Sequence, residues 1–215
     1  MNGGPLTVGR RPTAPWSDSP CSDGSLCRDE GDAGSRSYLY LPADSGQPAH
    51  MNPRTLPDTL EWQTDVLSEP MDFAGDIELH LDASITALDA AWIAVLYDVA
   101  PDGTATSLTG GWLRAMLREV NEKQSVPGAS VLDCAQPVAV PVGETVTYRI
   151  PIVPNARRIA AGHRLWIVLA GDDQPKGAPT LLGFTHTPVA LPSLNTVFSS
   201  SRLVAADPHR LTRLA

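Results

Sequence analysis

The sequence AWIAVLYDVAPDGT, residues 91–104, joins an uninterrupted apolar run to a Pro-Asp-Gly turn. An apolar run of this length that stops at turn residues predicts a buried β-strand followed by a tight turn. Beyond the turn come a short segment at 105–108, the pair Gly110-Gly111 and the run WLRAMLRE at 112–119. Strands at 105–108 and 112–119, separated by the glycines, would complete an antiparallel meander. We expect the rest of the chain to pack around this meander.

Other segments also have the patterns of short strands and turns. Strict alternation at 77–84 predicts a strand with one face on a core and the other in water. His80 falls on the polar face, which predicts a solvated surface histidine. Residues 154–160, which begin at a proline and precede Gly162, are compatible with one helical turn. Further strands are expected at 38–42, 61–67, 145–152 and 164–170, with weaker ones near 180–186 and 194–199.

Proline and glycine are frequent along the whole chain, with 20 and 17 occurrences in 215 residues. Residues that interrupt regular structure this often favour short strands and turns over long helices. Many short strands with regular turns predict an all-β fold, a jelly-roll β-sandwich. An immunoglobulin-like sandwich fits less well because its Cys–Trp–Cys core is missing.

The length and charge of the chain limit its organisation and its partners. We expect an irregular arm or linker remnant at 1–37, one sandwich at 38–204 and a tail at 205–215. A formal net charge of −8 argues against nucleic acid as a partner. No apolar run approaches the roughly 18 residues that span a bilayer. The first residues lack the features of a signal peptide, so we expect a soluble, cytoplasmic protein without membrane contact.

Neither a disulfide framework nor a calcium loop is predicted. The segment 19–30 has the EF-hand spacing at Asp23-Gly24 and Glu30, but Ser19 and Cys21 fill other early ligand positions and no helices flank it. The three cysteines, Cys21, Cys27 and Cys134, are too few for a disulfide framework. Free thiols are favoured over a disulfide that would close a small loop between Cys21 and Cys27.

No nucleophile motif is present. Ser35 and Ser130 each have one neighbouring glycine, whereas the Gly-x-Ser-x-Gly elbow of α/β-hydrolases needs two. Ser130, Asp172 and His186 follow the chain order of a hydrolase triad, but an order of this kind is expected by chance in a chain with so many serines and aspartates.

The histidines are too widely spaced for a helical metal pair; they lie at positions 50, 80, 163, 186 and 209. His163 and Arg164 open an apolar strand, and we interpret them as ties from that strand to a neighbouring loop. Asp172-Asp173 follow the same strand and are expected to be solvated. No P-loop, dinucleotide fingerprint or paired zinc spacing occurs. The residues therefore predict no catalytic, cofactor-binding or metal site.

Several motifs occur together in the order of one known domain. They are VLSEP at 66–70, an alternating strand that starts at Gly75, YDVAPDG at 97–103, GWLR at 111–114, RE at 118–119 and AGHRL at 161–165. This order resembles the C-terminal domain of the X-Pro dipeptidyl-peptidase and cocaine-esterase group of serine hydrolases (CocE/NonD, peptidase S15). YLPAD at 40–44 is similar to the segment by which that family enters the domain. The resemblance covers about residues 38–192.

The resemblance implies a jelly roll of galactose-binding-like topology that follows an α/β-hydrolase domain with a helical cap and packs against both. It also implies that the catalytic Ser, Asp and His belong to the preceding domain, so no catalytic residue can be carried over to this chain. Residues 1–37 resemble the end of the linker that leaves the hydrolase core.

The leading hypothesis is a non-catalytic accessory domain of an S15-type hydrolase, which buttresses the catalytic domain and borders its pocket. It predicts an exposed apolar patch, with Trp16, Trp62, Trp92 and Trp112 as candidates, the last two being favoured for the core. A homo-oligomer is an open alternative for the partner. The second hypothesis is a free-standing carbohydrate-binding jelly roll, which the aromatic content of 6% disfavours. Hydrolysis by this chain alone is the least favoured.

Overall fold

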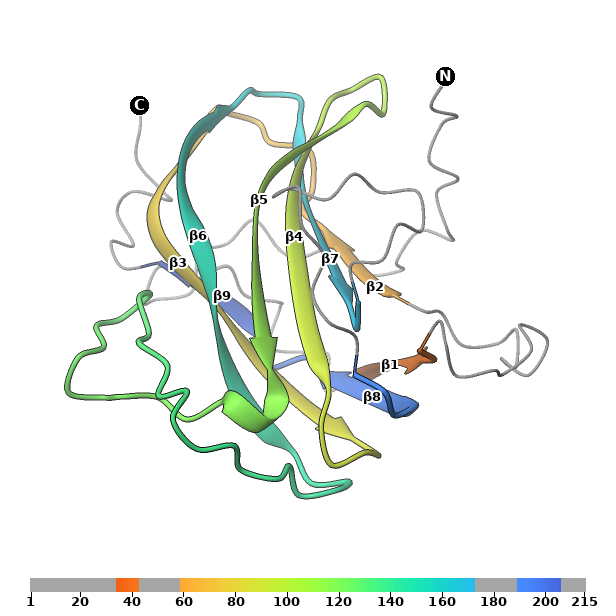
Figure 1. Ribbon diagram of the computed structural model, residues 1–215. Helices are drawn as coiled ribbons and strands as arrows, with labels where there is room; N and C mark the ends of the chain where they lie inside the picture. The colour runs from red at the N-terminus through yellow and green to blue at the C-terminus, as the bar shows by residue number, and fades with distance from the viewer. Residues whose placement is uncertain (1–33, 43–58, 173–188, 206–215) are drawn as a thin grey trace, which may run out of the picture.

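The computed structural model describes residues 34–42, 59–172 and 189–205, and in these ranges the chain is built from β-strands (Figure 1). A short 3-10 helix, Ala115–Leu117, follows the fifth strand. No helix within these ranges is long and apolar enough to cross a membrane. The strands are β1 (Ser35–Tyr40), β2 (Thr59–Gln63), β3 (Met71–Ile85), β4 (Ala91–Val99), β5 (Ala105–Arg114), β6 (Val146–Ile159), β7 (Arg164–Ala170), β8 (Ser193–Phe198) and β9 (Arg202–Ala205).

The nine strands form one antiparallel sheet that folds into two layers. The first layer is β1-β8-β3-β6, with β9 also paired to β3, and the second layer is β5-β4-β7-β2. In Figure 1 the second layer lies at the centre and right, with β6 and β3 to its left. The layers join at the pair Gly111–Ile152 between β5 and β6. At the other edge, Arg36 of β1 donates from Nη1 to the carbonyl oxygen of Glu61 in β2 over 2.7 Å. The predicted all-β sandwich of jelly-roll type is confirmed.

The opening meander is confirmed at its first strand and turn. β4 is followed by a turn in which the Gly103 amide donates to the Ala100 carbonyl over 2.9 Å. Gly103 has a φ of +87°, a conformation that strains residues with a side chain, so glycine is favoured there. The Asp102 carboxylate accepts a bond from the Thr104 amide over 2.9 Å, which closes the turn from its other side.

The predicted break at Gly110-Gly111 is wrong. β5 runs without interruption across both glycines, which pair with Val95 and Ala94 of β4. A Cβ on Gly111 would lie 2.2 Å from the carbonyl oxygen of Pro151 in β6. The glycine therefore allows the two layers to approach at their junction. The strand ends at Arg114, where the 3-10 helix replaces the strand expected as far as residue 119.

The predicted helical turn at 154–160 is also wrong, because β6 remains paired with β3 as far as Ile159. A proline inside a strand usually removes a ladder hydrogen bond. Here the ladder is irregular between Gly75 and Ile77 of β3, opposite Pro154. Pro154 therefore lies at a position where no regular ladder hydrogen bond needs an N–H donor.

Several strand ends differ from the expectations. β1 begins at Ser35, β2 covers 59–63 where 61–67 was expected, and β3 begins at Met71, six residues early. β8 confirms the weak strand expected near 194–199, and β9 was not expected at all. The strand expected at 180–186 lies outside the described residues. The proposed domain boundaries remain predictions, since 1–33 and 206–215 are outside the described ranges as well.

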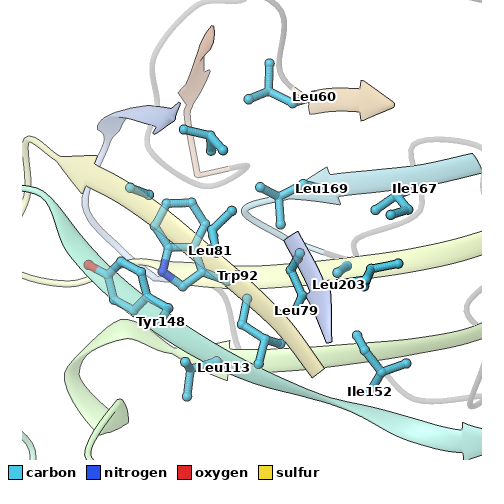
Figure 2. Packing of buried hydrophobic residues seen from close by; sticks show 14 of the residues in the cluster. Leu60, Leu79, Leu81, Trp92, Leu113, Tyr148, Ile152, Ile167, Leu169 and Leu203 are labelled. Carbon is cyan, nitrogen blue, oxygen red and sulfur yellow. The ribbon is translucent and has the colours of Figure 1, made fainter. Parts of the chain in front are cut away.

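The core lies between the two layers and contains aromatic rings packed edge-on and at a tilt. Trp92 of β4 is fully buried, and its ring centroid lies 5.2 Å from that of Tyr148 in β6 and 6.4 Å from that of Tyr38 in β1. Figure 2 shows Trp92 beside Leu81 of β3 and Tyr148, so one second-layer side chain reaches into the first layer. Burying large apolar side chains of this kind is the main stabilising contribution in a sandwich of this size.

Candidate functional site

The triad-like trio is not assembled as a hydrolase site among the described residues. Ser130 donates its amide to Glu78 Oε2 over 3.0 Å, and its hydroxyl also bonds this carboxylate. Asp172 lies near Tyr38 and Tyr40; burial raises the pKa of both hydroxyls, and the charge of Asp172 raises it further. His186 lies outside the described residues. The Ser130 hydroxyl thus faces an acid, whereas a catalytic serine needs a histidine base within hydrogen-bond reach.

Glu78 is the centre of a polar cluster that the sequence did not single out. Its side chain is 0% exposed and bonds His80 Nε2, while Arg149 Nη2 lies 3.2 Å from Glu78 Oε1. Burial alone would raise the pKa of Glu78, but hydrogen bonds from His80 and Ser130, together with the charges of His80 and Arg149, lower it to about 2. The carboxylate is therefore ionised throughout the physiological pH range.

His80 was expected to be a solvated surface residue, and this is wrong. Its side chain is only 20% exposed, because the segment between β5 and β6 covers this part of β3. The alternation at 77–84 does place Glu78 and His80 on the same face. That face carries a covering segment, however, and no local pattern in the sequence signals it.

The Glu78 cluster fixes the connecting segment, residues 118–145, to the outer face of the first layer. Ser130 belongs to this segment, and so does Glu122, which accepts bonds from Arg149 Nη1 over 3.1 Å to both carboxylate oxygens. A bridge between Val120 and Leu132 draws the segment into a loop. The charged groups of the cluster bond one another and so join the connecting segment to the sheet. The cluster therefore offers no unbonded base or nucleophile.

Arg114 of the GWLR motif and Arg118 of the RE motif stabilise the chain at the end of β5. Arg114 Nε bonds the carboxylate of the buried Asp89, and the other oxygen of Asp89 accepts the Met116 amide over 3.0 Å. Arg118 donates from Nη1 to the carbonyl of Val138 over 2.7 Å. These contacts hold the 3-10 helix and the start of the connecting segment, so the arginines of the GWLR and RE motifs are explained by folding.

The expected tie at the start of β7 is confirmed. His163 Nδ1 lies 2.7 Å from Asp98 Oδ1 at the end of β4, and the Leu67 amide donates to the His163 carbonyl over 2.8 Å. Arg164 donates from Nη1 to the Thr64 carbonyl over 3.3 Å. This group stabilises the end of the second layer.

Asp172 was expected to be solvated, but it is 8% exposed. Burial and, next, the charge of Asp172 raise the pKa of Tyr40 to about 12. The Tyr40 hydroxyl donates to the Val189 carbonyl over 2.9 Å, and a Cβ on Gly171 would lie 2.6 Å from the Tyr40 ring. Because the chain packs tightly around Tyr40, Gly171 and Asp172, which follow β7, lie in the interior. Asp173 lies outside the described residues.

The described part of the chain contains no group of three or more His, Cys, Asp or Glu side chains that could hold a metal ion. Cys134 is an exposed free thiol. The candidate calcium segment 19–30, the other two cysteines, His50 and His209 fall outside the described residues.

The tryptophans divide between the core and the outer surface. Trp92 is in the core as expected, whereas Trp112 is 36% exposed, so its expected core position is wrong. Trp62 packs against the edge of the core beneath the Arg36 guanidinium, 5.4 Å from its ring centroid. Trp166 packs at a tilt against Tyr97 with ring centroids 5.1 Å apart. Trp16 lies outside the described residues.

Comparison with known proteins gives one family. The family described as the X-Pro dipeptidyl-peptidase C-terminal non-catalytic domain matches residues 19–195. The cocaine esterase of Rhodococcus sp. (strain MB1 Bresler) is 28% identical over 154 residues, which cover 65% of this chain and 25% of the esterase.

Two solved structures have the same fold. A CocE/NonD family hydrolase from Staphylococcus aureus aligns with a TM-score of 0.63 at 15% identity, over 80% of this chain and 32% of the hydrolase. An aminopeptidase from a marine sediment Thaumarchaeota archaeon aligns with a TM-score of 0.58 at 19% identity, over 86% of this chain and 35% of the aminopeptidase. The chain therefore spans between a quarter and about a third of the length of these three proteins.

Proposed function

The chain belongs to the family of X-Pro dipeptidyl-peptidase C-terminal non-catalytic domains, and we propose that it acts as the accessory domain of an S15/CocE-type serine hydrolase. The hydrolase would be an Xaa-Pro dipeptidyl-peptidase or an acyl esterase. The match of the non-catalytic domain over residues 19–195 carries this proposal. The role of the domain is to pack on the α/β-hydrolase core and to border its substrate pocket, where it limits water access and shapes the fit of the substrate.

The geometry agrees with a non-catalytic role. The polar residues that sequence motifs drew attention to make hydrogen bonds within the sandwich: Ser130 to Glu78, and His163 to Asp98. The carbohydrate-binding alternative needs aromatic platforms beside polar groups. Among the aromatic residues whose exposure is described, only Trp112 reaches 36%. A cytoplasmic location stays a prediction.

A fusion protein tests the proposal. The catalytic part of the Rhodococcus cocaine esterase, without the 25% of its length that this chain matches, is fused ahead of the full 215-residue chain. We expect the fusion to hydrolyse a 4-nitrophenyl ester with a half-life at elevated temperature about tenfold or more above that of the same catalytic part fused to an unrelated β-sandwich. The chain alone is expected to give no turnover.

Two results would contradict the proposal. One is a fusion no longer-lived than its unrelated-sandwich control. The other is ester hydrolysis by the chain alone that Ser130→Ala abolishes, since this would make the chain itself the catalyst.

A further inference from the structure

The outer faces of the two layers differ in chemistry. On the first layer, β3 and the start of β6 place polar residues at the positions that alternate with the core: Glu78, His80, Asp82, Thr147 and Arg149. Further along β6 these positions hold Pro151 and the exposed Val153. The polar residues are linked to one another and to the connecting segment by hydrogen bonds and ion pairs, such as Thr147 Oγ1 to Asp82 Oδ1 over 2.6 Å. This face is built for contact with water and with its own loop.

The outer face of the second layer is apolar across its two inner strands. In β4 and β7, the core takes Trp92, Ala94, Leu96, Leu165, Ile167 and Leu169, so the residues between them point to the other side. These residues face one another in register as the pairs Ile93–Ala170, Val95–Val168 and Tyr97–Trp166. Trp112 of β5 pairs with Ile93 and extends the row. We name these seven residues the apolar strip: Ile93, Val95, Tyr97, Trp112, Trp166, Val168 and Ala170.

The apolar strip is accessible in part. Trp112 is 36% exposed, and Val95, Trp166, Val168 and Ala170 are half-buried, whereas Ile93 and Tyr97 are buried within the chain itself. A sheet face that meets water usually places polar side chains at these alternating positions, as the first layer does. Asp98 and His163, at the ends of the strands, bond each other, and Glu61 of β2 lies in register beside Val168 at the edge of the strip. The strip itself contains no charged side chain, so a partner that covers its centre buries no charge of the strip.

We propose that the apolar strip is the surface on which the α/β-hydrolase catalytic domain docks. This inference rests on the proposed function and identifies the face it uses. The occupant is argued from length and family, because the chain corresponds to 25% of the cocaine esterase and its family is the non-catalytic C-terminal part. The remaining three quarters of such a protein is large enough to cover a sheet face. Association through an apolar centre with few charges is typical of permanent interfaces.

Hydroxyl-radical footprinting of Trp112 and Trp166 tests the assignment. Their oxidation rates are compared between the 215-residue chain alone and the cocaine-esterase fusion described above. We expect both rates to fall about threefold or more in the fusion, because interface centres exclude water. Val168→Arg, which puts a charge in the strip, should restore the rates in the fusion. Thr147→Arg on the exposed outer face of the first layer is the matched control and should leave the protection unchanged.

Each other outcome overturns the assignment in a recognisable way. Protection of His80 in place of the tryptophans would leave the accessory function standing and move the docking face to the first layer. A stabilised fusion with no protection of either face would contradict docking through these layers, and an unstabilised one would refute the proposed function as well. A dimer of the chain alone that Val168→Arg dissociates would make a second copy the occupant. The wild-type comparison decides the matter even if Val168→Arg prevents folding.

Discussion

Replacing Glu78 by glutamine tests the electrostatics of the cluster that fixes the connecting segment. The carboxylate is 0% exposed, and its pKa is lowered from an ordinary 4.5 to about 2. This difference corresponds to about 3 kcal/mol of unfolding free energy that the ionised group contributes. Glu78→Gln keeps the shape of the side chain and removes the charge. We therefore expect the variant to be about 3 kcal/mol less stable at pH 7.

The pH dependence gives the prediction its sign. Because the pKa of Glu78 in the folded chain lies below that in the unfolded chain, its stabilisation is complete above about pH 5 and is lost as the pH falls towards 2. The loss is about 1.4 kcal/mol per pH unit in this window. The difference between wild type and Glu78→Gln should therefore shrink from about 3 kcal/mol at pH 7 to about 1 kcal/mol at pH 3.

Urea unfolding followed by tryptophan fluorescence at pH 7, 5 and 3 measures these differences. The matched control is Glu122→Gln, because Glu122 also bonds Arg149 but has a side chain 73% exposed. An exposed pair of this kind is worth less than about 1 kcal/mol. A difference for Glu78→Gln that does not change with pH, or an equal cost for Glu122→Gln, would refute the reasoning.

Three further substitutions test the packing that shapes the sandwich. Gly111→Ala should lower the unfolding free energy by about 2–3 kcal/mol, measured by urea titration, because its Cβ would lie 2.2 Å from a carbonyl oxygen of β6. Trp92→Ala should cost about 3–5 kcal/mol and remove the near-ultraviolet circular dichroism of the packed aromatic rings, because it empties the centre of the core. Asp89→Ala should cost about 2 kcal/mol or more and speed tryptic cleavage after the 3-10 helix, since the Arg114 guanidinium and the Met116 amide lose their acceptor.

The controls for these substitutions come from the same elements. Gly103→Asn should cost less than Gly111→Ala, because nothing lies within 4 Å of a Cβ there and the cost is only the strain of a φ of +87°, which is smaller for asparagine than for most side chains. Trp112→Ala should cost much less than Trp92→Ala, since its side chain is 36% exposed. Equal costs within either pair would contradict the packing described above. Unchanged proteolysis of Asp89→Ala would show that the 3-10 helix does not depend on that carboxylate.

Local patterns predicted most of the strands because apolar runs, alternation and turn residues are all visible in the sequence. The apolar runs predicted β4 and β7, alternation predicted the start of β6, and Pro-Asp-Gly predicted the turn at Gly103. The failures occurred where a local signal had a distant cause. Gly110-Gly111 suggested a break, but the glycines serve the close approach of β6. Pro154 suggested a helix start, but an irregular ladder opposite it in β3 accommodates the proline.

The Glu78 cluster could not be predicted for the same reason. Glu78 is separated by 52 residues from Ser130 and by 71 from Arg149, and no local pattern relates residues so far apart. The tie between His163 and Asp98 was anticipated because a histidine and an arginine at the start of an apolar strand need polar partners. Its specific partner came only from the pairing of β4 with β7.

The sequence by itself determined the class of the fold and the family, through alternation, turn residues and the order of motifs such as YDVAPDG and GWLR. It also determined that no hydrolase elbow is present, since that motif is local. Only the tertiary structure decided that Glu78 is buried and ionised, and that one outer face is polar while the other carries the apolar strip. Both depend on which strands lie side by side and which loop covers them, and those contacts join residues too distant in the chain for any local pattern to record.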